Sequence, residues 1–268
     1  MKRAIAPSSP RKKESFLQKI GKKLPIPLST AMALILAISI LAYALTQSVV
    51  FAIIAFAFIV ALVASDFSSD KDWKQNAVEL LFAVVFAIAA WFALSYVLQT
   101  DSPMNVVTSC SMLPALQRGD LVFIHGGVEN APVVNASFSS LSQTQVHKSL
   151  CYAGNAALPC TDEVIIGNRS VKANRENDII VFDPKPTGPG LLIHRVFAKI
   201  VTEQGAFYLT KGDNNAVLDQ ENGRFAFVAE KDIKGRVALR IPYVGYLKLF
   251  LFLQFEVPQG CDSVLTRP

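Results

Sequence analysis

The chain has 268 residues, of which 51% are hydrophobic and only 18% are charged, and its formal net charge is +5. An ordinary soluble domain carries about 25% charged residues, so this composition excludes a wholly soluble protein and indicates that part of the chain lies in lipid. Residues 1–23 hold eight Lys and Arg and one Glu, a net +7 that leaves −2 for the rest. The basic charge is therefore confined to a tail in front of an apolar segment, and we expect no nucleic-acid partner.

Three apolar runs follow this tail and predict a membrane anchor over residues 25–100. Residues 28–65 contain no charged side chain. As one helix they would be about 57 Å long, whereas the hydrocarbon core is about 30 Å thick. We therefore expect two transmembrane helices joined by a turn at Thr46-Gln47-Ser48. A third run, Ala77–Leu98, is interrupted only by Glu79, which lies early enough in the run to reach the interface.

The charge of the tail predicts the orientation of this anchor. Cationic residues stay on the cytoplasmic side, which makes residues 1–24 a basic cytoplasmic tail. Three transmembrane helices then place residue 101 onward on the extracytoplasmic side. We expect a multi-pass protein of the cell (plasma) membrane in contact with the lipid bilayer.

Residues 101–242 predict an extracytoplasmic domain that is mainly β. Short runs rich in β-branched and aromatic residues recur between Gly, Pro, Asn and Asp, a pattern typical of antiparallel strands. The segment 126–177 lacks this pattern, and we expect it to be a long insertion. Cys151 and Cys160 lie within it, and a disulfide between them is plausible outside the cytoplasm. The six strand-like runs are Leu121–Ile124, Asp178–Phe182, Leu191–Val201, Ala206–Thr210, Phe225–Val228 and Val237–Ile241.

The final segment, 243–268, begins with the apolar run YVGYLKLFLFLQF. These 13 residues are too few to span a bilayer comfortably. Two interpretations remain open: a strand or helix of the domain core, or a surface that enters the outer leaflet of the membrane.

Three polar elements occur in an order that suggests nucleophilic catalysis. Ser111 lies in a turn shaped by Pro114, His194 lies in an apolar strand, and Asp213 and Asp219 follow the strand AFYLT. A serine hydroxyl needs a base, a histidine can take its proton, and a carboxylate can orient the imidazole. Each element alone also has an ordinary structural explanation as a turn or core residue.

The motifs around these residues resemble those of type I signal peptidases. SCSMLPALQRGD (109–120) is similar to the S-G-S-M-x-P-x-L-x-x-G-D box of that family. HRV (194–196) and KGDNNAVLD (211–219) resemble the second and third boxes of its archaeal and endoplasmic-reticulum branch. NDIIVF (177–182) and RIPYVGYLKL (240–249) resemble flanking segments, so that the resemblance covers roughly residues 101–250 apart from the insertion.

The resemblance implies N-terminal transmembrane α-helices followed by a mainly β catalytic domain of the signal peptidase type. It implies a serine endopeptidase that removes N-terminal signal peptides from exported proteins after small residues, without a cofactor or metal. Ser111 would be the nucleophile, His194 the base and Asp219 the third catalytic residue. Asp213 would have a supporting role, and Ser109 would donate to the oxyanion. Pre-proteins bearing signal peptides are the expected partners, together with unidentified partners of the export machinery.

Cys110 departs from the family pattern, which has glycine at this position. Glycine permits positive φ and close approach of the backbone, so we expect a tighter turn or an altered oxyanion hole. A Cys110 nucleophile is the less favoured reading, because its side chain would point away from the base in an extended segment. A lysine base is a further alternative, with Lys172, Lys185, Lys199 and Lys211 as the candidates.

Two other functions remain open beside general signal peptide removal. The insertion 126–177 would suit a processing peptidase with a narrow set of substrates. Cys110 is the one feature that would suit an inactive membrane scaffold of the same fold.

Overall fold

A computed structural model describes residues 27–46, 49–67, 73–185, 190–223, 225–258 and 260–266. The chain divides into two compact units, Met1–Asp72 and Trp73–Pro268. The basic tail predicted at 1–24 lies outside the described residues.

The first unit contains two apolar helices, α2 (Leu28–Thr46) and α3 (Val49–Phe67), which contact each other. The boundary between them coincides with the turn predicted at residues 46–48, although Gln47 and Ser48 themselves lie outside the described residues. Their uninterrupted apolar stretches, Thr30–Tyr43 and Ile53–Leu62, are shorter than a comfortable span.

The second unit begins with α4 (Trp73–Leu98), which contains the apolar stretch Ala77–Leu98 of 22 residues. Of the described residues, only this helix is long and apolar enough to cross a membrane. The predicted anchor of three transmembrane helices over 25–100 stays a prediction. The end of α4 is fixed to the following domain, because Gly126 N donates to Leu98 O (2.8 Å) and Thr100 Oγ1 donates to Lys234 O (2.6 Å).

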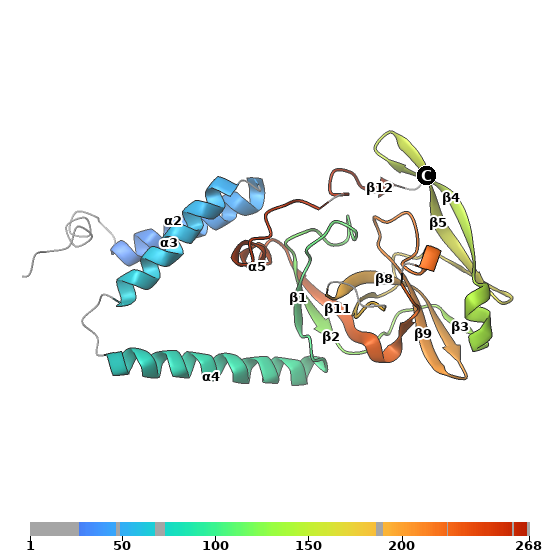
Figure 1. Ribbon diagram of the computed structural model, residues 1–268, viewed down its shortest axis with the longest axis horizontal. Helices are drawn as coiled ribbons and strands as arrows, with labels where there is room; N and C mark the ends of the chain where they lie inside the picture. The colour runs from blue at the N-terminus through green and yellow to red at the C-terminus, as the bar shows by residue number, and fades with distance from the viewer. Residues whose placement is uncertain are drawn as a thin grey trace, which may run out of the picture. The chain divides into compact units, whose positions relative to one another are not determined.

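The rest of the unit is mainly β, which confirms the predicted class of this domain. Within the described residues, the larger sheet has the order β1-β2-β11-β7-β8-β9-β10, with β3 paired to β8. Figure 1 labels β1, β2, β3, β8, β9 and β11 of this sheet. Its pairs are antiparallel except β3 with β8. The bounds are β1 (Met104–Val106), β2 (Leu121–His125), β3 (Val133–Asn135), β7 (Ile179–Phe182), β8 (Leu192–Thr202), β9 (Gly205–Lys211), β10 (Val228–Ala229) and β11 (Ile233–Ile241).

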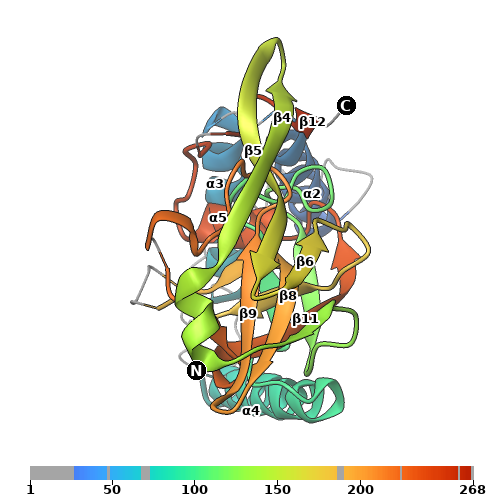
Figure 2. The same ribbon diagram turned by 90° about the vertical axis from the view of Figure 1, so that its right-hand side faces the viewer.

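The segment 126–177 is more regular than its sequence indicates. It contains β3, a 3-10 helix η1 (Phe138–Gln143) and most of a second sheet of order β12-β4-β5-β6. Figure 2 shows β4 and β5 as a long twisted hairpin whose tip extends past the strands of the larger sheet. The weak sequence pattern therefore did not reveal these strands, and the prediction that 126–177 is an insertion stays a prediction. The bounds are β4 (Gln145–Ala153), β5 (Ala156–Ile166), β6 (Arg169–Lys172) and β12 (Leu265–Thr266).

One cluster of the hydrophobic core lies where the two sheets meet. Val164 and Ile166 of β5 pack with Phe197 and Ile200 of β8 and with Leu209 of β9, and all five are buried. This packing fixes β8, which carries His194, and β9, which precedes Asp213 and Asp219. Two further 3-10 helices, η2 (Glu221–Gly223) and η3 (Glu230–Asp232), lie in the connections that follow β9.

The apolar run at 243–255 forms a short helix, α5 (Tyr246–Leu251). Tyr246, Leu249 and Phe250 are buried at helical spacing, so one side of the segment is a core element. Leu251, Phe252 and Leu253 are exposed. Entry into the outer leaflet, the other of the two interpretations for 243–268, stays a prediction for this exposed part.

Candidate active site

Ser111 lies on a closed loop, residues 107–120, between β1 and β2. Val107 N donates to Asp120 O (2.9 Å) and Gly119 N donates to Val107 O (2.8 Å), which closes the loop. Gly119 has φ +86°, a left-handed conformation that glycine adopts without strain. Met112 and Leu116 are buried in a cluster with Val107 and Val122, so the loop is anchored directly beside the serine.

His194 brings its imidazole to this loop from near the start of β8. Its Nε2 lies 2.9 Å from Ser111 Oγ, although the two residues are 83 positions apart in the chain. Its Nδ1 lies 2.6 Å from Asp219 Oδ2. His194 and Asp219 are each only 5% exposed. The structure thus joins the three side chains that the sequence singled out into one chain of hydrogen bonds.

Asp219 is held at the end of the loop that follows β9. Its backbone N donates to Thr210 O (3.0 Å), and Thr210 Oγ1 donates to its Oδ2 (2.7 Å). Gln220 Nε2 donates to the same Thr210 hydroxyl (3.2 Å), which directs the hydroxyl hydrogen to the carboxylate. A carboxylate at Nδ1 favours the tautomer with the proton on Nδ1, and Nε2 then presents its lone pair to Ser111.

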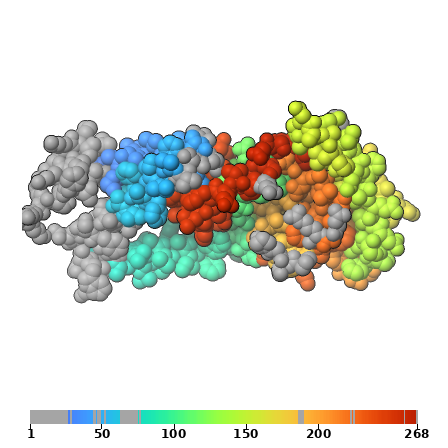
Figure 3. Space-filling view, turned by 45° about the horizontal axis from the view of Figure 1, so that its top comes forward, coloured from blue at the N-terminus to red at the C-terminus, as the bar shows by residue number. Residues whose placement is uncertain are grey.

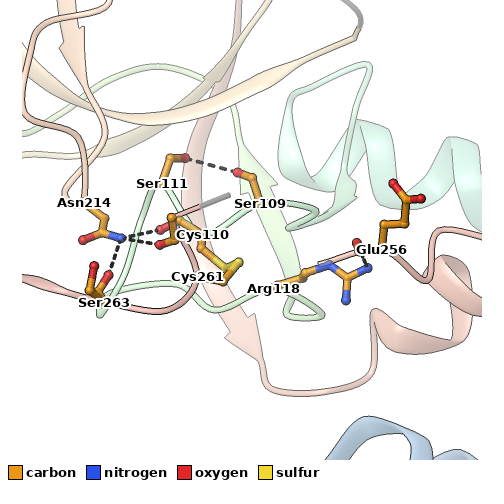
Figure 4. Close-up of a disulfide and its surroundings, with 9 residues drawn as sticks. Ser109, Cys110, Ser111, Arg118, Asn214, Glu256, Cys261 and Ser263 are labelled. Carbon is orange, nitrogen blue, oxygen red and sulfur yellow. Dashed lines mark hydrogen bonds between the residues drawn. A yellow bond between two sulfur atoms is a disulfide. The ribbon is translucent and has the colours of Figure 1, made fainter. Parts of the chain in front are cut away.

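Ser109 lies beside the nucleophile, with 3.2 Å between its Oγ and Ser111 Oγ (Figure 4). Both side chains therefore face the same space at the loop. This position suits a hydroxyl donor to an oxyanion that forms at Ser111.

Asp213 does not contact the imidazole. Its two carboxylate oxygens accept from Arg195 Nε (2.8 Å) and Nη2 (2.7 Å), and its side chain is 6% exposed. Arg195 also donates to Arg175 O and Asn177 O, each at 2.5 Å. The Arg195–Asp213 ion pair therefore joins the loop that follows β9 to the segment before β7. Arg195 was missed in the sequence, although it is the second residue of the HRV motif.

The lysines do not replace His194 in this arrangement. Lys211 is buried but its Nζ lies 3.4 Å from Gly212 O, and Lys199 is paired with Glu230 at 3.1 Å. Hydrogen bonding to Tyr208 and Glu230 raises the pKa of Lys199 despite partial burial. A general base has to lose its proton readily, so this shift opposes such a role.

The four cysteines form two disulfides, and Figure 4 shows the one between Cys110 and Cys261. Cys151 pairs with Cys160, as was considered plausible from the sequence. Cys110 pairs with Cys261, which was not foreseen. A Cys110 nucleophile is thereby excluded, because its sulfur is covalently occupied. Cys110 does not have a positive φ, so glycine is not required for the conformation of this turn.

No metal-binding cluster of three or more His, Cys, Asp or Glu occurs among the described residues. The chemistry that this arrangement favours is proton transfer from Ser111 to His194, followed by attack of the serine oxygen on a carbonyl carbon.

Comparison with known proteins identifies the family of this chain. The chain is 32% identical to the signal peptidase complex catalytic subunit SEC11 of Verticillium alfalfae over 190 residues, 69% of this chain and 86% of that protein. It is 34% identical to SEC11 of Arthroderma otae over 188 residues, 66% of this chain and 82% of that protein. The chain belongs to the type I signal peptidase family. SEC11 of Schizosaccharomyces pombe, at 27% identity over 195 residues, is a further relative. No family model matches the chain.

These signal peptidases correct the predicted location. The expectation of a multi-pass protein of the plasma membrane was wrong. The SEC11 relatives belong to the endoplasmic-reticulum branch, and in the part of the chain that the structure describes only one helix is long and apolar enough to span a membrane.

Proposed function

We propose that this chain is a serine endopeptidase that removes N-terminal signal peptides from exported proteins after small residues. The observation that carries the proposal is the continuous hydrogen-bonded series Ser111–His194–Asp219, buried at the imidazole and carboxylate. The kinship with SEC11 catalytic subunits supplies the substrate class, and by the same kinship we propose that the chain works in a complex with other subunits.

The geometry supports a two-step acyl transfer. Ser111 Oγ attacks the scissile carbonyl carbon while His194 Nε2 takes the hydroxyl proton, and Asp219 stabilises the imidazolium that forms. Ser111 N–H and Ser109 Oγ donate to the oxyanion. His194 then returns the proton to the leaving amine, which breaks the peptide bond and leaves an ester on Ser111. Water, deprotonated by the same imidazole, hydrolyses this ester.

The anchor supports a substrate that emerges from a membrane. The apolar stretch of α4 ends at Leu98, and two hydrogen bonds fix this end directly to the β domain. The site would therefore follow closely after the span, where a signal peptide leaves the bilayer. The two disulfides are typical of an oxidising compartment.

The β4–β5 hairpin favours a second candidate, a signal peptidase with a narrow set of substrates. Thr161 N donates to Ala216 O (2.8 Å), and Lys148 forms an ion pair with Glu221. These contacts attach the hairpin to the loop that carries Asp219. Cleavage of a general pre-protein after shortening of the hairpin tip, residues 152–157, would separate general from selective processing.

The test of the main proposal is cleavage of a purified pre-protein, followed by mass spectrometry of both products. Wild type should cut once, after a small residue, and Ser111→Ala should not. The matched variant Ser109→Ala should keep the nucleophile but lose an oxyanion donor, for which about 2.7–4 kcal/mol of transition-state stabilisation is typical. Normal processing by Ser111→Ala would refute the assignment of the nucleophile.

A further inference from the structure

The loop that carries Ser111 is tethered to a C-terminal segment, residues 260–266, that lies far from it in the chain. The Cys110–Cys261 disulfide joins the two across 151 residues. The same segment provides β12, which pairs with β4 through Leu265–Ala153 and Thr266–Tyr152. Figure 3 shows the dark red C-terminal segment at the surface beside the yellow-green hairpin. The segment thus connects the nucleophile loop with the hairpin.

Asn214 lies between the nucleophile loop and this C-terminal segment and binds both (Figure 4). On the loop side its backbone N donates to Ser111 O (2.7 Å) and its Nδ2 donates to Cys110 O (3.2 Å). Asn214 therefore holds the carbonyl group on each side of Ser111: that of Cys110, which precedes the Ser111 nitrogen, and that of Ser111 itself, which follows its Cα.

On the other side the Asn214 amide binds the C-terminal segment. Its Nδ2 donates to Gly260 O and Ser263 O, each at 3.0 Å, and its Oδ1 accepts from Leu265 N (2.7 Å). An amide group has two donor hydrogens and one acceptor oxygen, so three carbonyl oxygens share the two hydrogens. Replacement by aspartate would keep the acceptor but lose both donor hydrogens.

We propose that Asn214 and the Cys110–Cys261 disulfide form a double tether that positions the Cys110–Ser111 peptide for attack. Asn214 is a positioning residue here, because it acts on the Ser111 backbone and contacts neither the hydroxyl nor the imidazole. The Ser111 N–H is also the proposed oxyanion donor, so a rotation of this peptide would displace the hydroxyl and the donor together. The inference rests on the proposed peptidase function of this site.

Three variants test the tether by steady-state cleavage of a pre-protein. Asn214→Asp keeps the size of the side chain and the oxygen that accepts from Leu265 N. It replaces the donor Nδ2 by a second oxygen, which cannot donate to the three carbonyl oxygens that Nδ2 binds. Asn214→Ala removes both functions. The pair Cys110→Ser with Cys261→Ser removes the covalent tether. The matched control is the pair Cys151→Ser with Cys160→Ser, which removes a disulfide of the hairpin.

We expect Asn214→Asp and Asn214→Ala each to lower kcat about 10- to 100-fold with KM within about twofold, because misplacement of reacting groups reduces kcat. A role in filling space alone would leave the Asp variant close to wild type. We expect the effects of Asn214→Ala and loss of Cys110–Cys261 to be coupled, with a combined loss larger than the product of the single losses. When Asn214→Ala is combined with loss of the Cys151–Cys160 disulfide, the loss in kcat should equal the product of the two single losses.

Hydrogen exchange gives a readout that does not depend on turnover. Faster exchange over residues 110–116 in Asn214→Asp, with the β8 and β9 amides unchanged, would agree with the tether. Unchanged exchange and kcat in the Asp variant, or independent effects of the two tethers, would overturn it. Failure of the wild type to cleave the pre-protein would instead refute the proposed function, so the two failures are distinguishable.

Discussion

Asp219→Asn is the most informative change at this site, because both hydrogen bonds to the carboxylate end on the same oxygen. His194 Nδ1 and Thr210 Oγ1 lie 2.6 Å and 2.7 Å from Oδ2. Both neighbours are donors, so an asparagine should place its carbonyl oxygen there and accept both hydrogen bonds. The substitution should therefore remove the negative charge and leave the tautomer of His194 unchanged.

The magnitude follows from the charge alone. In the transition state the imidazolium and the carboxylate are opposite charges about 4 Å apart, which is worth about 4 kcal/mol at an effective dielectric constant of about 20. Each 1.36 kcal/mol is about tenfold in rate, so kcat should fall about 10³-fold. A substitution that also inverts the tautomer costs about 10⁴-fold. Asp219→Ala, which removes the acceptor altogether, should lose more activity than Asp219→Asn.

The assay is cleavage of a purified pre-protein by detergent-solubilised enzyme at saturating substrate, with thermal unfolding as the check on folding. Asp213→Asn is the matched control, because this carboxylate binds Arg195 and not His194. The control should keep kcat within about tenfold while losing up to about 3 kcal/mol of stability, since a largely buried arginine keeps an oxygen acceptor but loses the negative charge of its partner. A kcat of Asp219→Asn within tenfold of wild type would refute the electrostatic role. A loss equal to that of Ser111→Ala would refute the inferred hydrogen-bond arrangement.

Three further predictions concern other parts of the site. Ser111→Ala and His194→Ala should each abolish cleavage with membrane insertion intact, measured by product mass and membrane flotation. Retained activity in either variant would contradict the proposed roles. Gly212→Ala should lower kcat by at least tenfold, because its Cβ would come within 2.6 Å of Ser111 O; an active, stable variant would contradict this packing. Burial raises the pKa of Glu221, but hydrogen bonds from Lys148 and Thr161 outweigh it and leave the pKa lowered. The stability from this group is present above its unfolded-state pKa and is lost as pH falls through the folded-state value, below about pH 4.3. Unfolding curves of wild type and Glu221→Gln should therefore converge in acid, and a constant difference would be inconsistent with the shift.

The proximity of Ser111, His194 and Asp219 could be predicted because each lies in a short motif, and the three motifs follow one another in the same order as the boxes of the family. The resemblance gave Asp213 a supporting role, but the sequence did not indicate which residue it binds. Asp213 and Asp219 lie in one motif and are both carboxylates, so their partners could be identified only from the structure. Arg195 takes both oxygens of Asp213, whereas His194 contacts Asp219.

The hairpin was missed for a physical reason. Sequence patterns detect a strand by the face that it buries, but most of β4 is exposed and only Cys151 among its nine residues is buried. The pairing of β4 with β5 also shifts register between His147 and Lys148. Without a buried face, the alternation of apolar and polar residues that marks a strand does not arise. Backbone pairing and a disulfide hold the exposed part of this hairpin, and neither leaves a periodic signature, whereas burial is concentrated in the second half of β5, at Val164 and Ile166 among others.

The role of Cys110, which departs from the family pattern, could be recognised only from the structure. Four cysteines permit three pairings, and no spacing rule connects residues 110 and 261. Glycine at the family position would leave the peptide next to the nucleophile free of a side chain. This chain places a sulfur there, in a backbone conformation that cysteine adopts without positive φ, and uses it to bind the C-terminal segment. The substitution therefore does not remove a requirement of the turn. It adds a constraint on the peptide beside Ser111, in parallel with Asn214, and any C-terminal truncation that removes Cys261 should reduce kcat even though the triad is untouched.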